Sequence, residues 1–172
     1  MPASDDDLSP LVHLAGRGDE AAFSELFRRY YERLRAFAWR NVFDSQAAED
    51  IVQETFIRTA RQMHALRDGR AFEGWLFRIT ANLSRDHLRS RVSHEKKIAA
   101  AAMESPGRQS ELSPQVELAL QSLPAAQREA VALVYYEGCN HADAARRLGC
   151  AEATISWRIM LAKRALKKFL KP

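Results

Sequence analysis

Residues 72–91, FEGWLFRITANLSRDHLRSR, carry two periodic patterns at once. The apolar residues recur at intervals of four, three and four, which predicts one buried face of an α-helix: Phe72, Leu76, Ile79 and Leu83. A polar set has the same spacing on another face: Arg78, Asn82, Arg85 and Arg89. Their planar, fork-like donors suit phosphates and base edges. The stretch therefore predicts a helix that packs on a core and presents an arginine row to nucleic acid.

Three aromatic residues crowd the beginning of this helix, beside a polar turn at residues 67–70: Phe72, Trp75 and Phe77. Rings beside a basic face suit single-stranded DNA, because bases stack on them without regard to sequence. Aromatic residues are equally ordinary in protein cores. We expect two of the three to lie in the core.

The preceding segment, residues 50–58 (DIVQETFIR), predicts a helix with a polar stripe of the kind that docks on another protein. One side can face a core through Ile51, Thr55, Phe56 and Thr59. The other side holds Asp50, Gln53, Glu54 and Arg58. Glu54 and Arg58 can pair along the helix for a few tenths of a kcal/mol. From spacing alone, that local pair is the simpler explanation of the stripe.

The remaining composition predicts an all-α chain. Of 172 residues, 47% are hydrophobic and only 7 are glycine and 6 proline, and alternating β-type runs are absent. No apolar run is long enough to cross a bilayer, so no membrane insertion is expected. The beginning of the chain (MPASDDDLSP) is acidic and polar, unlike a secretory signal. We expect a cytoplasmic protein.

The chain divides into two helical domains, at residues 11–92 and 114–172. Between them, residues 93–113 lack aromatics, include Ser105-Pro106-Gly107, and predict a flexible linker.

The second domain predicts a helix-turn-helix. Asn140 can cap a short helix at residues 141–148, which stops at Gly149, and a longer basic helix runs over residues 152–168. Its predicted buried face consists of Ile155, Ile159, Ala162 and Leu166. Trp157 lies about 200° from Ile155 and points away from that core. The side chains that can reach a DNA groove are Thr154, Ser156, Arg158 and Arg164.

Basic residues gather in two separate segments. Residues 78–97 hold six against two acidic ones, and six follow from Arg158 onward with no acidic residue. Two basic segments suit a chain that meets a polyanion at two places, although solvated helix faces are often basic too.

Candidates for metal or catalytic chemistry are few. Cys139, Cys150 and His141 fall short of a closed zinc set, and a reducing compartment disfavours a disulfide. The histidines are scattered, and neither a phosphate-binding glycine loop nor a recognisable nucleophile is present. We expect no metal, cofactor or catalytic residue, and a protein that is not an enzyme. A redox or metal role of the two cysteines stays open.

In combination, these segments resemble the extracytoplasmic-function (ECF) group of bacterial RNA polymerase sigma factors, of the sigma-70 family. Residues 50–58 look like conserved region 2.2, and residues 71–91 like regions 2.3 and 2.4. Leu123-Pro124, Gln127-Arg128-Glu129 and residues 135–166 look like region 4. Three motifs in the right order are far more specific than any one of them.

The resemblance implies roles for these segments. Asp50, Gln53 and Glu54 would bind the clamp helices of the β′ subunit of RNA polymerase core, which also contains β. The loop at residues 66–73 and the arginine row would handle the melted −10 element of promoter DNA, and the helix at residues 152–168 would read the −35 element. The implied DNA-binding residues are Arg78, Asn82, Arg85, Arg89, Thr154, Ser156, Trp157, Arg158 and Arg164. The free protein is expected to bind DNA poorly, because a flexible linker would leave its domains unaligned. The alternative that the two domains pack together and hide their DNA faces stays open.

The chain departs from the family pattern in its recognition helix. Ala151 replaces the usual capping serine, which loses a cap that contributes about 1 kcal/mol. Ser156 stands where a basic residue is usual, and Trp157 where a small one is usual. Trp157, Met160 and Leu161 would form an apolar outer patch, and our hypothesis is that an anti-sigma factor covers it.

Two other classes of protein stay open. A sigma-mimicking antagonist that titrates an anti-sigma factor usually carries a receiver domain, for which this chain has no room. A conventional helix-turn-helix regulator would explain only the last third of the sequence.

Overall fold

The computed structural model describes residues 8–95 and 112–169. All regular structure within these ranges is helical, which confirms the all-α prediction. Most of the predicted linker, residues 96–111, lies outside the described residues. None of the described helices is both long and apolar enough to span a bilayer.

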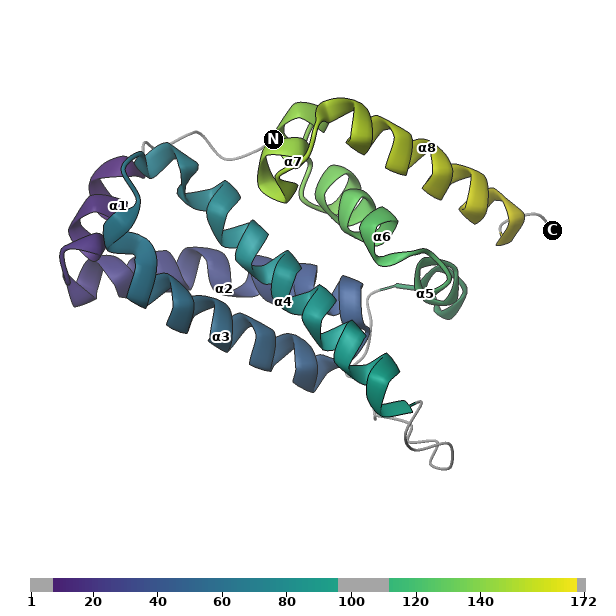
Figure 1. Ribbon diagram of the computed structural model, residues 1–172, viewed down its shortest axis with the longest axis horizontal. Coiled ribbons are helices and arrows are strands. Elements are labelled where there is room, and N and C mark those ends of the chain that lie inside the picture. Colours follow the sequence, from purple (N-terminus) through teal and green to yellow (C-terminus); the bar gives the residue numbers. More distant parts are fainter. Residues whose placement is uncertain (1–7, 96–111, 170–172) are drawn as a thin grey trace.

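The N-terminal domain is a bundle of helices (Figure 1). Its elements are α1 (Ser9–Gly16), α2 (Glu20–Val42), α3 (Ser45–Gln62), the 3₁₀ turns η1 (Met63–Ala65) and η2 (Gly69–Ala71), and α4 (Phe72–Glu95). Helices α2, α3 and α4 pack against one another, and α1 packs on α2 and the two turns. The largest fully buried side chains at its centre are aromatic and aliphatic: Leu26, Leu34, Phe37, Phe72, Leu76 and Phe77.

Aspartates begin the long helices, and a strained residue ends one of them. The side chains of Asp19 and Asp44 accept hydrogen bonds from the amides of Ala22 and Ala47, which caps α2 and α3. Helix α2 ends at Phe43, whose φ of 52° is left-handed and uncommon for a residue with a Cβ. Only Phe43 and Asp44 separate α2 from α3.

The turn before α4 depends on a close approach of two backbones. A Cβ built on Gly69 would lie 2.5 Å from the Cα of Ser9 in α1. Only glycine allows α1 to pack this closely on η2.

The buried face of α4 is rotated from the predicted one. Phe72 and Leu76 are buried as expected, but Ile79 and Leu83 are only half-buried. The residues that continue the stripe are instead Thr80 and Ser84, both fully buried. Their hydroxyls donate to the carbonyl oxygens one turn earlier, at 3.0 and 2.9 Å, so no polar atom is buried unpaired there. The prediction that Ile79 and Leu83 continue the buried face was wrong. Thr80 and Ser84 take their place, because side chains whose hydroxyls are hydrogen-bonded within the helix can pack in the core.

The C-terminal domain contains the predicted helix-turn-helix. Its elements are α5 (Pro114–Gln121), α6 (Ala125–Val131), a wide π-type turn η3 (Ala132–Tyr136), α7 (His141–Leu148) and α8 (Glu152–Phe169). Asn140 caps α7 through a 2.8 Å bond from the amide of Asp143, and Gly149 ends it with a φ of 67°. On α8, Ile155, Ile159 and Ala162 are buried, whereas Leu166 is half-buried.

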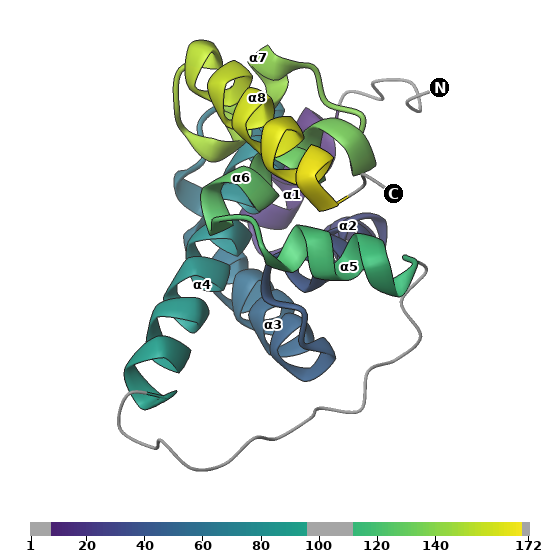
Figure 2. The ribbon, with the colours of Figure 1, turned by 90° about the vertical axis from the view of Figure 1, so that its right-hand side faces the viewer.

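The two domains pack against each other rather than standing apart. Helix α4 lies against α7, and α2 lies against α6 and η3 (Figures 1 and 2). The buried apolar residues of both domains form one continuous cluster. Our expectation that the domains are unaligned is therefore wrong, and the alternative that they pack together is confirmed, because apolar and charged surfaces of the two domains complement each other.

Candidate functional site

The polar stripe of α3 lies on an open face of the N-terminal domain. Asp50 and Gln53 are exposed and Glu54 is half-buried, while the Glu54 carboxylate accepts from Arg58 at 2.7 Å. The opposite side of the helix is buried in the core as predicted: Ile51, Thr55, Phe56 and Thr59. Figures 1 and 2 show α3 on the side of the bundle away from α7 and α8. The stripe is thus free to meet another protein while the two domains are packed together.

The arginine row of α4 lies at the domain interface. Arg85 donates two hydrogen bonds to the carboxylate of Glu129 in α6, at 2.6 and 2.8 Å. The Glu129 side chain is only 1% exposed. These bonds raise the pKa of Arg85 despite its partial burial. Arg85 also donates to Asn82 at 2.8 Å, so two members of the row are tied to this contact.

The other two arginines of the row differ from each other. Arg78 donates to the backbone carbonyl of Arg146 in α7, at 2.9 Å. Arg89 is exposed and pairs with Asp86 of its own helix at 2.9 Å. The C-terminal domain therefore holds Arg78 and Arg85, but not Arg89, among the predicted DNA-binding residues.

A second group of charges joins α2, α4 and α7 with Glu137, the residue that follows η3. Arg33 of α2 contacts Glu73 of α4 at 2.7 Å and Glu137 at 2.9 Å, and Arg147 of α7 contacts Glu73 at 2.6 Å. Burial disfavours the charged form of Arg33, but the two carboxylates outweigh that effect and its pKa is raised. The Arg147 guanidinium lies over the Phe77 ring, 4.7 Å from its centre. We call Arg33–Glu137, Arg147–Glu73 and Arg85–Glu129 the interdomain salt bridges.

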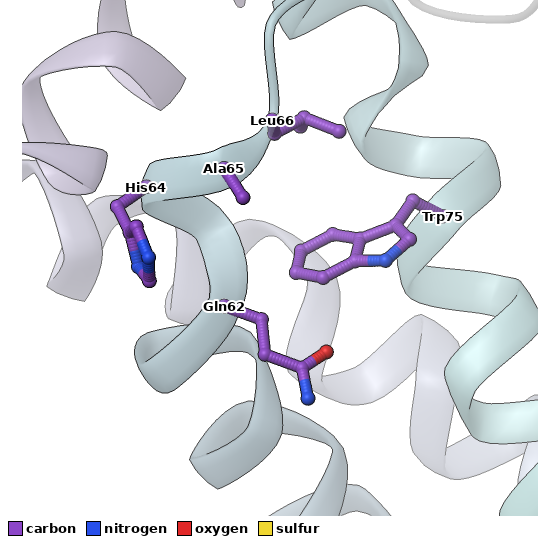
Figure 3. A pocket seen from close by; sticks show the side chains of 5 residues that line it. All are labelled: Gln62, His64, Ala65, Leu66 and Trp75. Carbon is purple, nitrogen blue, oxygen red and sulfur yellow. The ribbon is translucent and has the colours of Figure 1, made fainter.

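A cavity opens beside Trp75, between the turn after α3 and the beginning of α4 (Figure 3). It has a volume of about 370 Å³ and is lined by Gln62, His64, Ala65, Leu66 and Trp75. The indole of Trp75 points toward the turn, with Ala65 and Leu66 on one side and Gln62 on the other. Phe72 and Phe77 are fully buried, so the prediction that two of the three aromatics lie in the core is confirmed.

The outer face of α8 presents polar, basic and apolar groups together. Ser156 and Arg164 are exposed, and Thr154 and Arg158 are half-buried. Ser156 is within 2.8 Å of the imidazole Nδ1 of His141, which ties it to the first helix of the motif. Trp157 is 57% exposed and Met160 55%, and Leu161 is half-buried beside them.

The two cysteines are both free thiols, Cys139 buried and Cys150 half-buried. Burial raises the pKa of the Cys139 thiol. Within residues 8–95 and 112–169, no group of three or more histidine, cysteine, aspartate or glutamate side chains is placed to hold a metal ion.

Sequence reasoning missed the residues that join the domains: Arg33, Glu73, Glu129, Glu137 and Arg147. Glu129 lies in the Gln127-Arg128-Glu129 motif, but nothing in its spacing identifies Arg85, 44 residues away, as its partner. Arginines and glutamates are common on exposed helix faces, and only the packed helices bring these ones together.

Comparison with known proteins identifies the family. Residues 26–93 match the model of Sigma-70 region 2, and residues 113–166 match that of Sigma-70, region 4. The chain is 32% identical to the RNA polymerase sigma-H factor of Pseudomonas aeruginosa, over 94% of this chain and 93% of the relative. It is 34% identical to the ECF RNA polymerase sigma factor SigM of Mycobacterium tuberculosis, over 92% and 81%. The chain belongs to the sigma-70 family, in its ECF group, and its two domains are sigma regions 2 and 4.

A solved structure shares the fold across both domains. The sigma factor RpoE from Bartonella quintana, solved in complex with the anti-sigma factor NepR, superposes with a TM-score of 0.72 at 30% identity. The match covers 86% of this chain and 96% of RpoE. Neither domain alone makes up that share of the chain, so the match includes both.

Proposed function

We propose that this chain is a promoter-specificity subunit of RNA polymerase. It binds the core enzyme through α3 and directs initiation to promoters whose −10 and −35 elements its two domains contact. The observation that carries the proposal is the open polar stripe on α3, in a chain that matches regions 2 and 4 in the family's order. Polymerase performs the covalent chemistry, so the chain needs no cofactor or catalytic residue of its own. It acts where polymerase acts, in the cytoplasm.

The stripe on α3 is the proposed contact with core polymerase. Asp50, Gln53 and Glu54 offer carboxylate and amide groups on adjoining turns of one rigid helix. The clamp helices of β′, together with β, are the surface that the family resemblance assigns to them. The Glu54–Arg58 pair is half exposed and contributes little to stability, so changes at the stripe test binding rather than folding.

The N-terminal domain is the proposed site for the opened −10 strand. The cavity is lined by the half-buried ring of Trp75 and has a polar edge at Gln62 and His64, which suits one unstacked base. Arg78, Asn82, Arg85 and Arg89 continue along α4 and would hold the phosphates of the same strand.

Helix α8 is the proposed reader of the −35 element. It is the second helix of a helix-turn-helix, the element that enters the major groove in such motifs. Thr154, Ser156, Arg158 and Arg164 would contact bases or phosphates from its flanks. Trp157 lies on the same outer face and would contact the DNA with them.

An anti-sigma factor is the proposed regulator, and the apolar patch on α8 is its proposed contact. Two exposed side chains of the patch, Trp157 and Met160, are costly to leave in water and mark a protein-binding surface. The RpoE relative, which is bound to an anti-sigma factor, supports a partner of this class. A Trp157→Ala variant should lose anti-sigma affinity; unchanged affinity with weaker promoter binding would refute the assignment.

In vitro transcription tests the proposed function. Core polymerase is given a genomic template library with and without the protein, and transcript starts are mapped. We expect new, promoter-specific starts that vanish with a Gln53→Ala/Glu54→Ala double variant. They should persist with Glu25→Ala, which changes an exposed ion-paired glutamate on α2. Failure to bind core would refute the proposal and favour a sigma mimic or a conventional regulator.

A further inference from the structure

We infer that Ser156 meets the −35 element as a hydrogen-bond acceptor only, because the protein itself uses the single proton of its hydroxyl. Ser156 then selects a base that presents an amino group in the major groove, which is adenine or cytosine. His141 is the positioning residue that fixes this polarity. The inference rests on the proposed function, because it takes α8 to be the helix that reads the −35 element.

Ser156 lies beside the junction of the two helices of the motif. Helices α7 and α8 pack against each other (Figures 1 and 2). Ser156 is exposed near the beginning of α8, directly after the buried Ile155. His141 is the first residue of α7, which the Asn140 side chain caps. The N-terminal part of a recognition helix contacts base edges in such motifs, so an exposed serine there can reach a base.

Two groups of the protein hold the Ser156 hydroxyl. Nδ1 of the His141 imidazole lies 2.8 Å from Oγ of Ser156, and the backbone carbonyl oxygen of Glu152 lies 3.3 Å from it. The contact with His141 is the stronger one, because 3.3 Å is long for a bond that a hydroxyl donates. A hydroxyl has one proton to donate and two lone pairs that accept. His141 therefore has the larger influence on how the Ser156 hydroxyl is turned.

The result is the same for every protonation state of the His141 ring. When Nδ1 carries a hydrogen, it donates to Oγ, and the hydroxyl donates to the Glu152 carbonyl. When Nδ1 carries none, the hydroxyl of Ser156 donates to it. In both cases the hydroxyl proton is used within the protein, and a lone pair of Oγ remains for DNA. The −35 element therefore meets an acceptor at Ser156 and no donor.

An acceptor distinguishes two pairs of bases in the major groove. Adenine and cytosine present amino groups there, N6 and N4, which donate. Guanine and thymine present the carbonyl oxygens O6 and O4, which only accept and are repelled by Oγ. At the base that Ser156 contacts, adenine or cytosine should be preferred roughly fivefold, the factor that one neutral hydrogen bond of about 1 kcal/mol contributes.

A promoter library tests the inference with the holoenzyme. Core polymerase and the full chain transcribe barcoded templates whose −35 element is randomised, and sequencing of the barcodes gives the base preference at each position. Ser156→Ala removes the acceptor, so the preference for an amino group should disappear at one position and persist elsewhere. His141→Phe keeps a ring but removes Nδ1, which frees the hydroxyl to turn and donate. The preference at the same position should then decrease to about twofold or less.

Two control variants separate the hydrogen bond from a general effect on the fold. The amide of His141→Asn places a hydrogen-bonding atom as many bonds from Cα as Nδ1, so this variant should keep most of the preference. Lys167→Ala changes an exposed cation in the last turn of α8 and should leave the preference at that position unaltered.

The outcomes distinguish the inference from the proposed function. A preference that survives Ser156→Ala would overturn the inference, as would one for guanine or thymine that Ser156→Ala removes. Equal losses in His141→Phe and His141→Asn would overturn the role of the His141 hydrogen bond. A library from which the unaltered holoenzyme yields no promoter-specific starts would overturn the proposed function instead.

Nitrogen NMR of the free chain is the second measurement, and it needs no promoter. The imidazole ¹⁵N resonances are compared between the unaltered chain and Ser156→Ala, which changes an exposed side chain and should keep the fold. The hydrogen bond predicts that the Nδ1 resonance of His141 moves, while those of the other histidines stay in place. An unmoved His141 resonance would overturn the inference whatever the chain does in transcription.

Discussion

Replacing Glu129 with glutamine should release Arg85 and increase DNA binding by the free protein. Glu129 accepts two hydrogen bonds from Arg85 and is fully buried, whereas about a third of the Arg85 side chain is exposed. Glutamine keeps the shape and one acceptor but loses the charge. A hydrogen bond to a charged group contributes about 1.5–3 kcal/mol, and the exposure of Arg85 favours the lower part, about 1.5–2 kcal/mol. This loss corresponds to a roughly 10- to 30-fold shift of the equilibrium from packed domains, the closed state, toward separated domains, the open state.

Fluorescence anisotropy with a labelled single-stranded oligonucleotide measures this shift. Because only the open state binds, the apparent affinity of the free protein is reduced by the fraction that is closed. Glu129→Gln should therefore bind roughly 10- to 30-fold more tightly at 0.1 M salt, as estimated above. Glu25→Gln removes the same charge from an exposed ion pair on α2 and should change affinity less than about twofold.

Two results would refute this reasoning. Equal gains in Glu129→Gln and Glu25→Gln would show that only net charge matters. A gain that persists when Arg85→Ala is added to Glu129→Gln would show that Arg85 is not the group released.

Three further predictions concern the local chemistry of the chain. Iodoacetamide should modify Cys150 roughly tenfold faster than Cys139, because burial shields the Cys139 thiol and raises its pKa. Peptide mass spectrometry measures the two rates, and equal rates would contradict this prediction. Ala151→Ser should stabilise the chain by about 1 kcal/mol in urea unfolding by giving the first turn of α8 a side-chain acceptor, and a lower midpoint would argue against a missing cap. Thr80→Val should cost about 1 kcal/mol in the same assay because a buried hydroxyl bond is lost, and an unchanged midpoint would contradict that.

The helices and their ends were largely predictable because local chemistry determines them. Asn140 and Gly149 delimit α7 as expected. The three- and four-residue spacing in residues 50–59 identified the core side of α3 and its polar stripe. Phe43 gave no such signal. A left-handed helix end is usually glycine, and the strain here is borne by an aromatic residue that contacts Trp39 and Arg128.

The contact of Arg85, a predicted DNA-binding residue, with the C-terminal domain was not predictable from the sequence. Arg85 reads as a solvent-exposed member of a basic face, and only tertiary packing places Glu129 against it. The rotation of α4 was missed for a related reason, since Thr80 and Ser84 look polar until their hydroxyls are paired within the helix. The sequence patterns predicted two surfaces that we propose meet partners, and in the structure the C-terminal domain contacts two arginines of one of them.

The central claim is that this chain is a sigma factor in which the C-terminal domain holds Arg78 and Arg85, the arginines that we propose bind promoter DNA, until polymerase separates the two domains. Spin labels measure the distance between the domains when placed by Ser90→Cys on α4 and Lys163→Cys on α8, both exposed positions, in a chain whose native thiols are removed by Cys139→Ala and Cys150→Ser. The account predicts one short, narrow distance distribution for the free protein and a longer one when active core polymerase is added. A free protein that already shows the long distance, or an active holoenzyme that keeps the short one, would contradict it.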